Sequence, residues 1–500
     1  MDNVISHLAL EIEEQRSNYI KNTATEHKET FGQYLTPYSV AKYMAAWFPD
    51  PDGKVFLLDP GAGAGSLSCA FVQNMVDRGL KKDFQLDCVE SDNRIIPELR
   101  SNLKRLSEIS RISLRVFNED FVKYAVDNIL SFEKPIYTHA IINPPYQKIH
   151  SKSEHRKLMK MVDIDVVNMY AAFVALSLEL LKDQGYLVAI IPRSFCNGTY
   201  YRPFRRHILA NAVIKHIHLF NSRKSVFKDE SVLQENIIIM LQKTDIRAEV
   251  EITYSDDVDL SQVNSIKYQY SSIVNENTKE LIINIPLTAD HKENSFSTPY
   301  SKLGVIVSTG PVVDFRSRDF ISQEYTKEYA PLIYPQHISD FTAFWPNNDP
   351  AKPDSIRICP NTMKMLYKKG FYIVVRRFSS KEEKRRIVAA IIKPADFTGD
   401  YLAFENHLNV FHSGGSGLEE SIAYGLLCYL NTLEFDRQFR VFSGHTQVNA
   451  GDLKRMIYPS RYELAMLGEM VKTNALTYEN FEIYSERLEN GKTGTNQKEA

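Results

Sequence analysis

The sequence predicts an α/β fold, in which a doubly wound, Rossmann-like and mostly parallel sheet of seven strands is followed by a second, α+β domain. Three observations predict it. Between about residues 55 and 245, short apolar runs alternate with segments of helical length and periodicity. A glycine-rich loop joins the first run to the first of these segments. Beyond about residue 301 the pattern becomes mixed and aromatic.

The alternation defines the elements of the first domain. Because strands separated by helices usually pair in parallel, each apolar run is interpreted as one strand of a single sheet. The predicted strands are 55–59, 84–90, 112–117, 138–142, 186–191, 214–219 and 236–241. The predicted helices are 66–79, 93–107, 168–183 and 202–211. The second domain is expected to contain a strand at 371–378 and a helix at 418–432.

These patterns divide the chain into five segments. They are an amphipathic N-terminal helix within 1–30, the α/β domain over 31–245, a polar connecting segment over 246–300, the α+β domain over 301–480 and a flexible tail over 481–500.

The composition excludes several classes of protein. With 43% hydrophobic residues among 500, the chain can bury large cores. Its 60 Lys and Arg nearly balance 62 Asp and Glu, which excludes a uniformly basic nucleic-acid binder and requires any such partner to meet a local patch. The five scattered cysteines argue against a zinc site or a disulfide framework and predict an intracellular protein. Neither a signal peptide nor a membrane span is expected.

The glycine-rich loop predicts a nucleotide-like ligand. Asp59 ends the first strand and leads through Gly61 and Gly63 into a helix, and glycines there let the backbone turn sharply and approach a ligand. Glu90 ends the next strand, where a carboxylate can accept hydrogen bonds from ribose hydroxyls. A dinucleotide and a methyl donor fit equally well, and a plain tight turn is the alternative. Asp120, after the third strand, is either an acceptor for an adenine amino group or a helix N-cap.

A second turn, Asn143-Pro144-Pro145-Tyr146, follows the fourth strand. Open α/β sheets bind ligands along this edge, so the turn is interpreted as part of a site rather than as a bare bend. The Asn143 side-chain oxygen and the Pro144 carbonyl could accept both hydrogens of an exocyclic amine such as adenine N6, and stabilise the charge that develops on it. Methyl transfer to such an amine requires neither a metal nor a general base with a tuned pKa.

The order of these motifs resembles that of S-adenosylmethionine-dependent N6-adenine DNA methyltransferases. The matching motifs are Asp59-Pro-Gly-Ala-Gly, Glu90, Asp120-Phe121 and Asn143-Pro-Pro-Tyr146. The resemblance implies S-adenosylmethionine as the cofactor, no metal, and a position for Asn143 beside both the cofactor and the target base.

An upstream segment, FGQYLTP, is similar to the motif that closes over the methionine end of the cofactor in the γ-ordered class of this family. By this resemblance Tyr34, Thr36 and Pro37 line the cofactor site. A polar loop before a helix is the alternative interpretation of the segment.

Aromatic residues are expected to hold the target base. A base inside a duplex cannot reach the turn unless it is flipped out, and Tyr146 would then stack on it. The family places a second aromatic on the opposite face, before the last strand of the sheet. Phe227 is the candidate and Phe220 the alternative.

Three basic and polar segments in the second domain predict DNA contacts: first Ser308–Gly310 with Phe315–Arg318, second Arg376–Lys381, and third Phe439–Asn449. Arg and Lys would supply phosphate contacts, and neighbouring polar side chains would supply base contacts. A solvated surface is the alternative for any one of them. The expected DNA-binding residues are Arg316, Arg376, Arg377, Lys381, Arg440, His445 and Gln447.

The three segments resemble the target-recognition half of restriction–modification adenine methyltransferases of the PstI/BsuBI and XhoI kind, and SGHTQVNAGDL is a characteristic phrase. The resemblance implies a type II, site-specific adenine-N6 DNA methyltransferase that protects host DNA. A bacterial, cytoplasmic monomer acting on double-stranded DNA is expected, with no membrane association and with a separate cognate restriction endonuclease. RNA or a protein glutamine is the alternative substrate, because methyltransferases of this fold also use the Asn-Pro-Pro-Tyr turn. A non-catalytic DNA-binding subunit and a nicotinamide-dependent enzyme fit that turn poorly.

Overall fold

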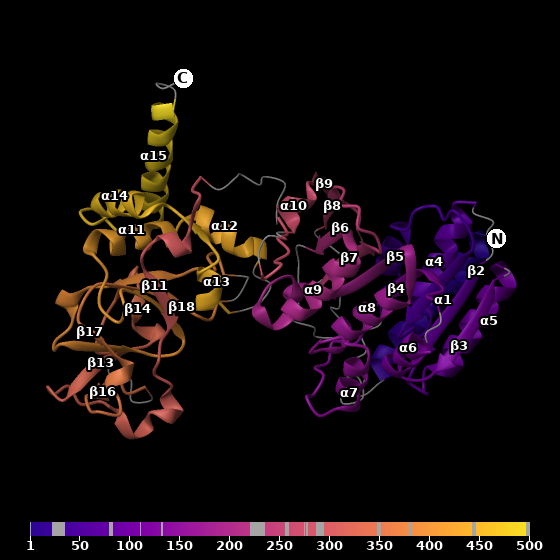
Figure 1. Cartoon of the computed structure of the whole chain (residues 1–500), viewed down its shortest axis with the longest axis horizontal. Coiled ribbons are helices and arrows are strands. Elements are labelled where there is room, and N and C mark those ends of the chain that lie inside the picture. The colour runs from indigo at the N-terminus through magenta and orange to yellow at the C-terminus, as the bar shows by residue number, and fades with distance from the viewer. Residues whose placement is uncertain are drawn as a thin grey trace. The chain divides into compact units, whose positions relative to one another are not determined.

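The computed structural model describes residues 2–22, 36–79, 84–110, 112–131, 134–220, 236–255, 260–274, 276, 279–286, 295–347, 352–379, 383–442 and 447–496. The chain divides into two compact units, Met1–Ile285 and Pro286–Ala500 (Figure 1). None of the described helices combines the length and the apolar character that crossing a bilayer demands.

The first unit contains a mixed sheet of nine strands in the order β3-β2-β1-β4-β5-β7-β6-β8-β9. From β3 to β5 every neighbouring pair is parallel, whereas β7 runs antiparallel to both β5 and β6. The order reverses between β1 and β4, which is where doubly wound sheets bind ligands. The strands are β1 (Val55–Pro60), β2 (Phe84–Glu90), β3 (Ser113–Asn118), β4 (Tyr137–Ile142), β5 (Leu181–Pro192), β6 (Val213–Phe220), β7 (Asn236–Gln242), β8 (Val250–Ser255) and β9 (Asn264–Tyr268).

Helices cover both faces of this sheet. One core contains buried residues of α6, α8 and α9, and the other contains those of α1, α3, α4 and α5. Because both faces are covered, the central strands are apolar on both sides, and this arrangement confirms the predicted α/β fold. The helices are α1 (Asp2–Asn22), α3 (Tyr38–Ala46), α4 (Ser66–Asp77), α5 (Ile96–Ser110), α6 (Phe121–Leu130), α7 (Glu154–Met161), α8 (Met169–Leu180), α9 (Arg202–Asn211) and α10 (Tyr270–Ile273).

The structure corrects the prediction that residues 246–300 are only a connecting segment. Strands β8 and β9 lie in it and extend the sheet from the seven predicted strands to nine, with β8 parallel to β6 and β9 antiparallel to β8. β9 is an edge strand whose side chains are mostly exposed. Its polar residues suit an edge strand that is exposed to solvent, and for the same reason the sequence of β9 resembles that of a loop.

The described part of the second unit contains a two-stranded sheet, a group of helices and two larger sheets (Figure 1). One sheet has the order β11-β21-β18-β19-β15-β14 and the other β12-β16-β13-β20-β17. The strands of the first are β11 (Ile306–Thr309), β14 (Ile338–Ser339), β15 (Thr342–Ala343), β18 (Tyr372–Arg376), β19 (Ala389–Ile392) and β21 (Leu408–His412). Those of the second are β12 (Ile321–Ser322), β13 (Tyr329–Ile333), β16 (Ser355–Arg357), β17 (Leu366–Lys368) and β20 (Tyr401–Phe404).

The helices of this unit follow its sheets in the chain. They are α11 (Glu420–Leu430), α12 (Leu433–Phe442), α13 (Ala450–Leu453), α14 (Arg461–Val471) and α15 (Tyr478–Asn496), and a short pair of strands joins β10 (Thr298–Pro299) to β22 (Ile457–Tyr458). Gly425 and Gly468 let α11 and α14 approach closely, because a Cβ on either would collide with the backbone of the other helix.

The structure also corrects the prediction of a flexible tail over 481–500. Helix α15 continues to Asn496, and its Phe481 is fully buried. The sequence of this segment is polar with few apolar residues, so it resembles a tail although the buried side chains of Phe481 and Leu488 anchor it.

Candidate functional site

The glycine-rich loop between β1 and α4 has backbone angles that favour glycine. Gly61, Gly63 and Gly65 have φ angles of 72°, 56° and 93°, a region that other residues rarely adopt. The N–H of Gly61 donates to the carbonyl of Val89 at 2.7 Å, which ties the loop to the end of β2. A Cβ on Gly61 would lie 3.4 Å from the ring of Phe173 in α8. The loop is thus held at the carboxyl edge of the sheet.

Glu90, at the end of β2, faces this loop. Its buried carboxylate accepts hydrogen bonds from the backbone N–H groups of Gly63 at 2.9 Å, and of Ser91 and Asp92 at 2.8 Å each. Burial raises the pKa of Glu90, and the three N–H groups oppose that rise. Because each carboxylate oxygen can accept more than one hydrogen bond, Glu90 is fixed in place and can still accept from a ligand hydroxyl.

Asp59 lies beneath the loop and is fully buried. Its Oδ2 accepts a hydrogen bond from Oγ of Ser68 at 2.5 Å, whereas its Oδ1 meets no donor within the part of the chain that the structure describes. Burial raises the pKa of Asp59 to about 7; Ser68 opposes the rise and Glu90 adds to it. A cationic ligand group would stabilise the ionised carboxylate, because it would supply the charge that water cannot.

The Asn143 turn lies beside the glycine loop. A Cβ on Gly61 would be 3.9 Å from the backbone oxygen of Asn143. The Nδ2 of Asn143 donates to Oγ1 of Thr36 at 2.8 Å, although the two residues are 107 positions apart. Thr36 and Pro144 are buried. Because the amide nitrogen points toward Thr36, the amide oxygen points elsewhere, and two of the predicted motifs form one site.

Tyr146 is half-buried after the turn. Its hydroxyl donates to the carbonyl of Ile190 in β5 at 3.4 Å, and its ring lies edge-on to Tyr170, with centroids 6.3 Å apart. The chain then pairs with the start of α8, where the N–H of Met169 donates to the carbonyl of Gln147 at 2.8 Å. These contacts fix the exit of the turn.

Asp120 caps helix α6. Its Oδ1 accepts from the N–H of Lys123 at 3.0 Å, and its Oδ2 lies 2.9 Å from Nε2 of His155 in α7. Burial raises the pKa of Asp120, but the hydrogen bonds from His155 and Lys123 outweigh it and the pKa is lowered. The N-cap interpretation is confirmed, and the contact with an adenine amino group stays a prediction.

Helix α1 reaches the rim of the site, which sequence reasoning missed. Tyr19 donates to Asp92 at 2.9 Å, next to the loop that binds Glu90. Asn102 donates to the carbonyl of Ala64 in the glycine loop at 3.0 Å and to Gln15 of α1 at 2.8 Å. The amphipathic pattern of α1 indicated a packed helix but carried no signal for its position.

Arg205 holds the loop that follows β5 at the same sheet edge. It is fully buried, and its Nη1 donates to the carbonyls of Phe195 and Asn197 at 2.8 Å each. Its Nη2 donates to the carbonyls of Gly198 at 2.8 Å and Glu280 at 2.7 Å. Arg205 is one of three arginines in α9, and nothing in the sequence singled it out for this role.

Two predicted residues of the first unit, Tyr34 and Phe227, lie outside the described residues, and their roles stay predictions. Pro37 immediately precedes α3 as its N-cap. Phe220 ends β6, is buried, and packs edge-on against His218, with centroids 4.6 Å apart.

In the second unit, the predicted residues Arg376, Arg377 and Gln447 lie close together. The Nη2 of Arg376 donates to the carbonyl of Ile338 at 2.7 Å. The N–H of Val448 donates to the carbonyl of Arg377 at 2.7 Å, and the residue after Arg377 pairs with Gln447 in an antiparallel bridge. Two of the three basic segments are therefore adjacent.

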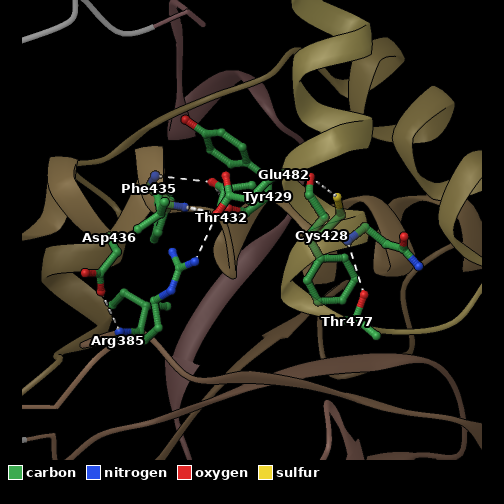
Figure 2. A network of polar contacts seen from close by, with 12 residues as sticks. Arg385, Cys428, Tyr429, Thr432, Phe435, Asp436, Thr477 and Glu482 are labelled. Atoms are coloured by element: carbon green, nitrogen blue, oxygen red, sulfur yellow. Dashed lines mark hydrogen bonds and ion pairs between the residues drawn. The ribbon is translucent and has the colours of Figure 1, made fainter.

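Several basic side chains of this unit form ion pairs within it. The Nε of Arg440 lies 2.6 Å from Oδ2 of Asp436. Arg385, which extends the second basic segment, is buried and pairs with Glu482 of α15 at 3.0 Å (Figure 2). Arg440 thus pairs within its own helix α12, and Arg385 connects the chain before β19 to α15, and the sequence alone cannot distinguish either from a surface arginine.

Arg316 is exposed, and its guanidinium lies over the ring of Phe315 at 5.3 Å. The other two predicted DNA-binding residues, Lys381 and His445, lie outside the described residues.

A doubly wound sheet whose glycine loop, acidic strand end and Asn-Pro-Pro-Tyr turn share one edge defines a Rossmann-like methyltransferase. The chain is 40% identical over 481 residues to the type II methyltransferase M.BsuBI of Bacillus subtilis, covering 94% of this chain and 96% of the relative. It is 38% identical over 461 residues to M.PstI of Providencia stuartii, covering 89% and 90%. The family model "Eco57I restriction-modification methylase" matches residues 57–227. The chain belongs to this family of type II methyltransferases.

The similarity extends to solved structures. The type IIL restriction-modification enzyme MmeI in complex with DNA is similar over 96% of this chain and 73% of that chain, with a TM-score of 0.51 and 12% identity, which shows a shared fold. Family membership makes S-adenosylmethionine the cofactor, as the motifs predicted. The buried carboxylate of Asp59 and the fixed carboxylate of Glu90 fit its cationic methionine part and its ribose.

Proposed function

We propose that this enzyme transfers a methyl group from S-adenosylmethionine to N6 of an adenine within a specific sequence of duplex DNA. The contact between Asn143 and Thr36, beside the glycine loop, carries the proposal. Because Thr36 accepts from the amide nitrogen of Asn143, the amide oxygen is oriented as the acceptor that an exocyclic amine requires. Similarity to type II methyltransferases supports DNA as the substrate.

The chemistry at this corner is positioning and charge stabilisation. The lone pair of adenine N6 is delocalised into the ring, which makes N6 a poor nucleophile. Hydrogen bonds from its two hydrogens to Oδ1 of Asn143 and the carbonyl of Pro144 would favour a tetrahedral nitrogen and stabilise the developing positive charge. When bound, the cofactor would supply the methyl group from its sulfonium, and the bonding electrons of the broken S–C bond would remain on the sulfur of a neutral thioether product. The methylated nitrogen then loses one proton to solvent.

The target adenine must leave the duplex to reach this corner, at a cost of a few kcal/mol. Tyr146 is held through its hydroxyl by Ile190 and would stack on one face of the base. Stacking contributes about 1–3 kcal/mol per base, so two aromatic faces would offset most of the cost of extrusion. Phe227 is our candidate for the second face, with Phe220 as the alternative.

We further propose that this methylation protects host DNA from a separate, cognate restriction endonuclease in the bacterial cytoplasm. The bacterial type II relatives support this role. A monomer would suffice, because one strand is modified at a time and no two-fold match to the site is required.

Labelled S-adenosylmethionine tests the substrate class directly. The purified enzyme is incubated with plasmid DNA, with ribosomal RNA or with a release factor, at several salt concentrations. Label is expected in DNA alone. Label in RNA or in the protein but not in DNA would contradict the DNA proposal and favour the alternative substrate, while methyl transfer itself would stand.

A further inference from the structure

The three basic segments of the second unit meet at the loop between β20 and β21. Between the two parts of the first segment, the carbonyl of Val312 accepts from the N–H of Asn406 at 2.9 Å. In the second, the N–H of Arg377 donates to the carbonyl of His407 at 2.9 Å. The third segment joins them through Val448, whose N–H donates to Arg377. Segments that are far apart in the sequence therefore surround this one loop.

A cavity of about 560 Å³ opens beside the β20–β21 loop. This volume is within the range that accommodates a small ligand or part of a larger one. Acidic, basic and aromatic side chains all contribute to its wall. Its lining includes Asp314, Phe315, Arg318, Lys352, Glu405 and His407.

His407 is fixed at the wall of this cavity and is accessible. Its Nδ1 lies 2.6 Å from Oε1 of Glu405, and its backbone N–H donates to Oε2 of Glu405 at 2.8 Å. The side chain of Glu405 is buried, whereas 45% of the His407 side chain is exposed. The ring of Phe378, an exposed residue of the second basic segment, lies 5.1 Å from that of His407. With Nδ1 directed at the carboxylate, Nε2 is the ring atom left to meet a partner.

The other walls carry an aromatic ring and several charges. Phe315 is 69% exposed, and Arg316 lies over its ring. Lys352 forms an ion pair with Asp314 across the cavity wall, and Arg318 is exposed. Large exposed aromatic side chains next to cations commonly mark surfaces that bind a partner, and nucleic acid offers both phosphates and planar bases.

We infer that this cavity contacts one base pair of the methylated DNA sequence, with His407 as a specificity-determining residue that Glu405 positions. Nε2 of His407 forms a hydrogen bond to a base edge, while Phe315 and the cations around it contact the sugar–phosphate backbone. This inference rests on the proposed function. It adds a specificity-determining residue, His407, that lies in none of the three basic segments.

The test compares His407→Ala and Phe315→Ala with the wild type. The methylated adenines of a plasmid are first located by sequencing, which gives the recognition sequence. kcat/KM is then measured on that duplex and on duplexes that each carry one replaced base pair. Tyr462→Ala is the matched control, because Tyr462 is an aromatic residue of the same unit, 75% exposed on α14 and away from the cavity lining.

We expect His407→Ala to lose about tenfold of the discrimination at one base pair and to keep it at the others, as removal of one good base contact should. Phe315→Ala should weaken DNA binding severalfold without changing the preference, and its exposed position makes misfolding an unsuitable explanation. Neither variant should alter the affinity for S-adenosylmethionine, and Tyr462→Ala should match the wild type.

Unchanged discrimination at every position in His407→Ala would overturn the inference. An equal loss of rate on all duplexes, together with weaker cofactor binding, would assign His407 a structural role and would also overturn it. Both results require a wild type that methylates DNA. A wild type that binds and methylates no DNA would instead overturn the proposed function, and the inference with it.

Discussion

The two units differ in what surrounds the polar residues that the sequence singles out. In the first unit they come together at one sheet edge, where Asn143 contacts Thr36 and Glu90 contacts Gly63. In the second unit several basic residues form contacts within the unit, as Arg440 does with Asp436. Strand order brings residues that follow parallel strands to a common edge. A basic run has no such constraint, so its charges can face DNA or a neighbouring helix.

The largest expected effect is on turnover, and it tests the site at the sheet edge of the first unit. Asn143→Ala removes the amide that would accept from the target amine, and turnover should fall by at least about 100-fold, as when one oriented hydrogen-bonding group is lost from a reacting centre. The affinity for S-adenosylmethionine, measured by calorimetry, should be nearly unchanged. Asn361→Ala, an exposed asparagine of the second unit, is the control. Full activity in Asn143→Ala would contradict our assignment of the turn.

Asp59 gives the next largest effect, through pH. Burial raises its pKa to about 7. If Asp59 faces the cationic methionine part of the cofactor, as we propose, only its ionised form would attract that part. The dissociation constant for S-adenosylmethionine should therefore rise about tenfold per pH unit as the pH falls below about 7. Asp59→Asn should bind weakly and with no such dependence.

The same residue has the opposite effect on the stability of the cofactor-free enzyme. Because burial raises the pKa of Asp59 above its unfolded value of about 3.9, its favourable contribution to folding is present at low pH and is lost as the pH rises through about 7. Thermal unfolding of wild type and Asp59→Asn between about pH 4 and pH 7 measures this contribution to stability. Parallel pH profiles for the two proteins would contradict the assignment.

A smaller effect on kcat is expected from substitutions of Thr36, which holds Asn143 in the first unit. Thr36→Val keeps the shape of the side chain but removes the acceptor for Nδ2 of Asn143, so kcat should fall by up to about tenfold, in line with the free energy of one hydrogen bond. Thr36→Ser retains the hydroxyl and should keep most of the rate. A higher KM for S-adenosylmethionine with unchanged kcat in Thr36→Val would show that Thr36 acts through the cofactor alone.

The smallest effects separate two kinds of arginine in the second unit. Arg316 is exposed, so Arg316→Ala should lower DNA affinity and reduce the salt dependence of binding by about one phosphate contact, with no change in Tm. Arg440 is largely buried beside Asp436, so Arg440→Ala should cost about 1 kcal/mol of stability in addition to any loss of DNA binding. An unchanged Tm in Arg440→Ala would place this arginine with the surface residues.

Much of the first unit could be predicted because its strands and its glycine loop are determined by residues that are neighbours in the sequence. The strands are apolar on both sides, and the glycine loop requires positive φ angles, so both leave a clear pattern in the sequence. Strand β9 was missed because a polar edge strand resembles a loop, whereas β8 lies between β6 and β9 and is mostly buried, so its apolar pattern was overlooked among polar neighbours. The hydrogen bond between Asn143 and Thr36 and the contact of Tyr19 with Asp92 were missed because a pairing across many residues leaves no periodicity.

The second unit was less predictable for a different reason. Its short strands and irregular connections carry weak patterns, and the partner of each arginine depends on tertiary packing. Arg385 illustrates this, since nothing near it in the sequence indicates Glu482, 97 positions later (Figure 2). The convergence of three segments on the β20–β21 loop likewise depends on tertiary structure.

The identity of the methylated base tests the central claim most directly. Plasmid DNA treated with the enzyme and S-adenosylmethionine is digested to nucleosides, which are separated and weighed by mass spectrometry. The Asn143 corner predicts N6-methyladenine from the wild type and none above background from Asn143→Ala. N4-methylcytosine or 5-methylcytosine as the product, or equal N6-methyladenine from both proteins, would contradict it.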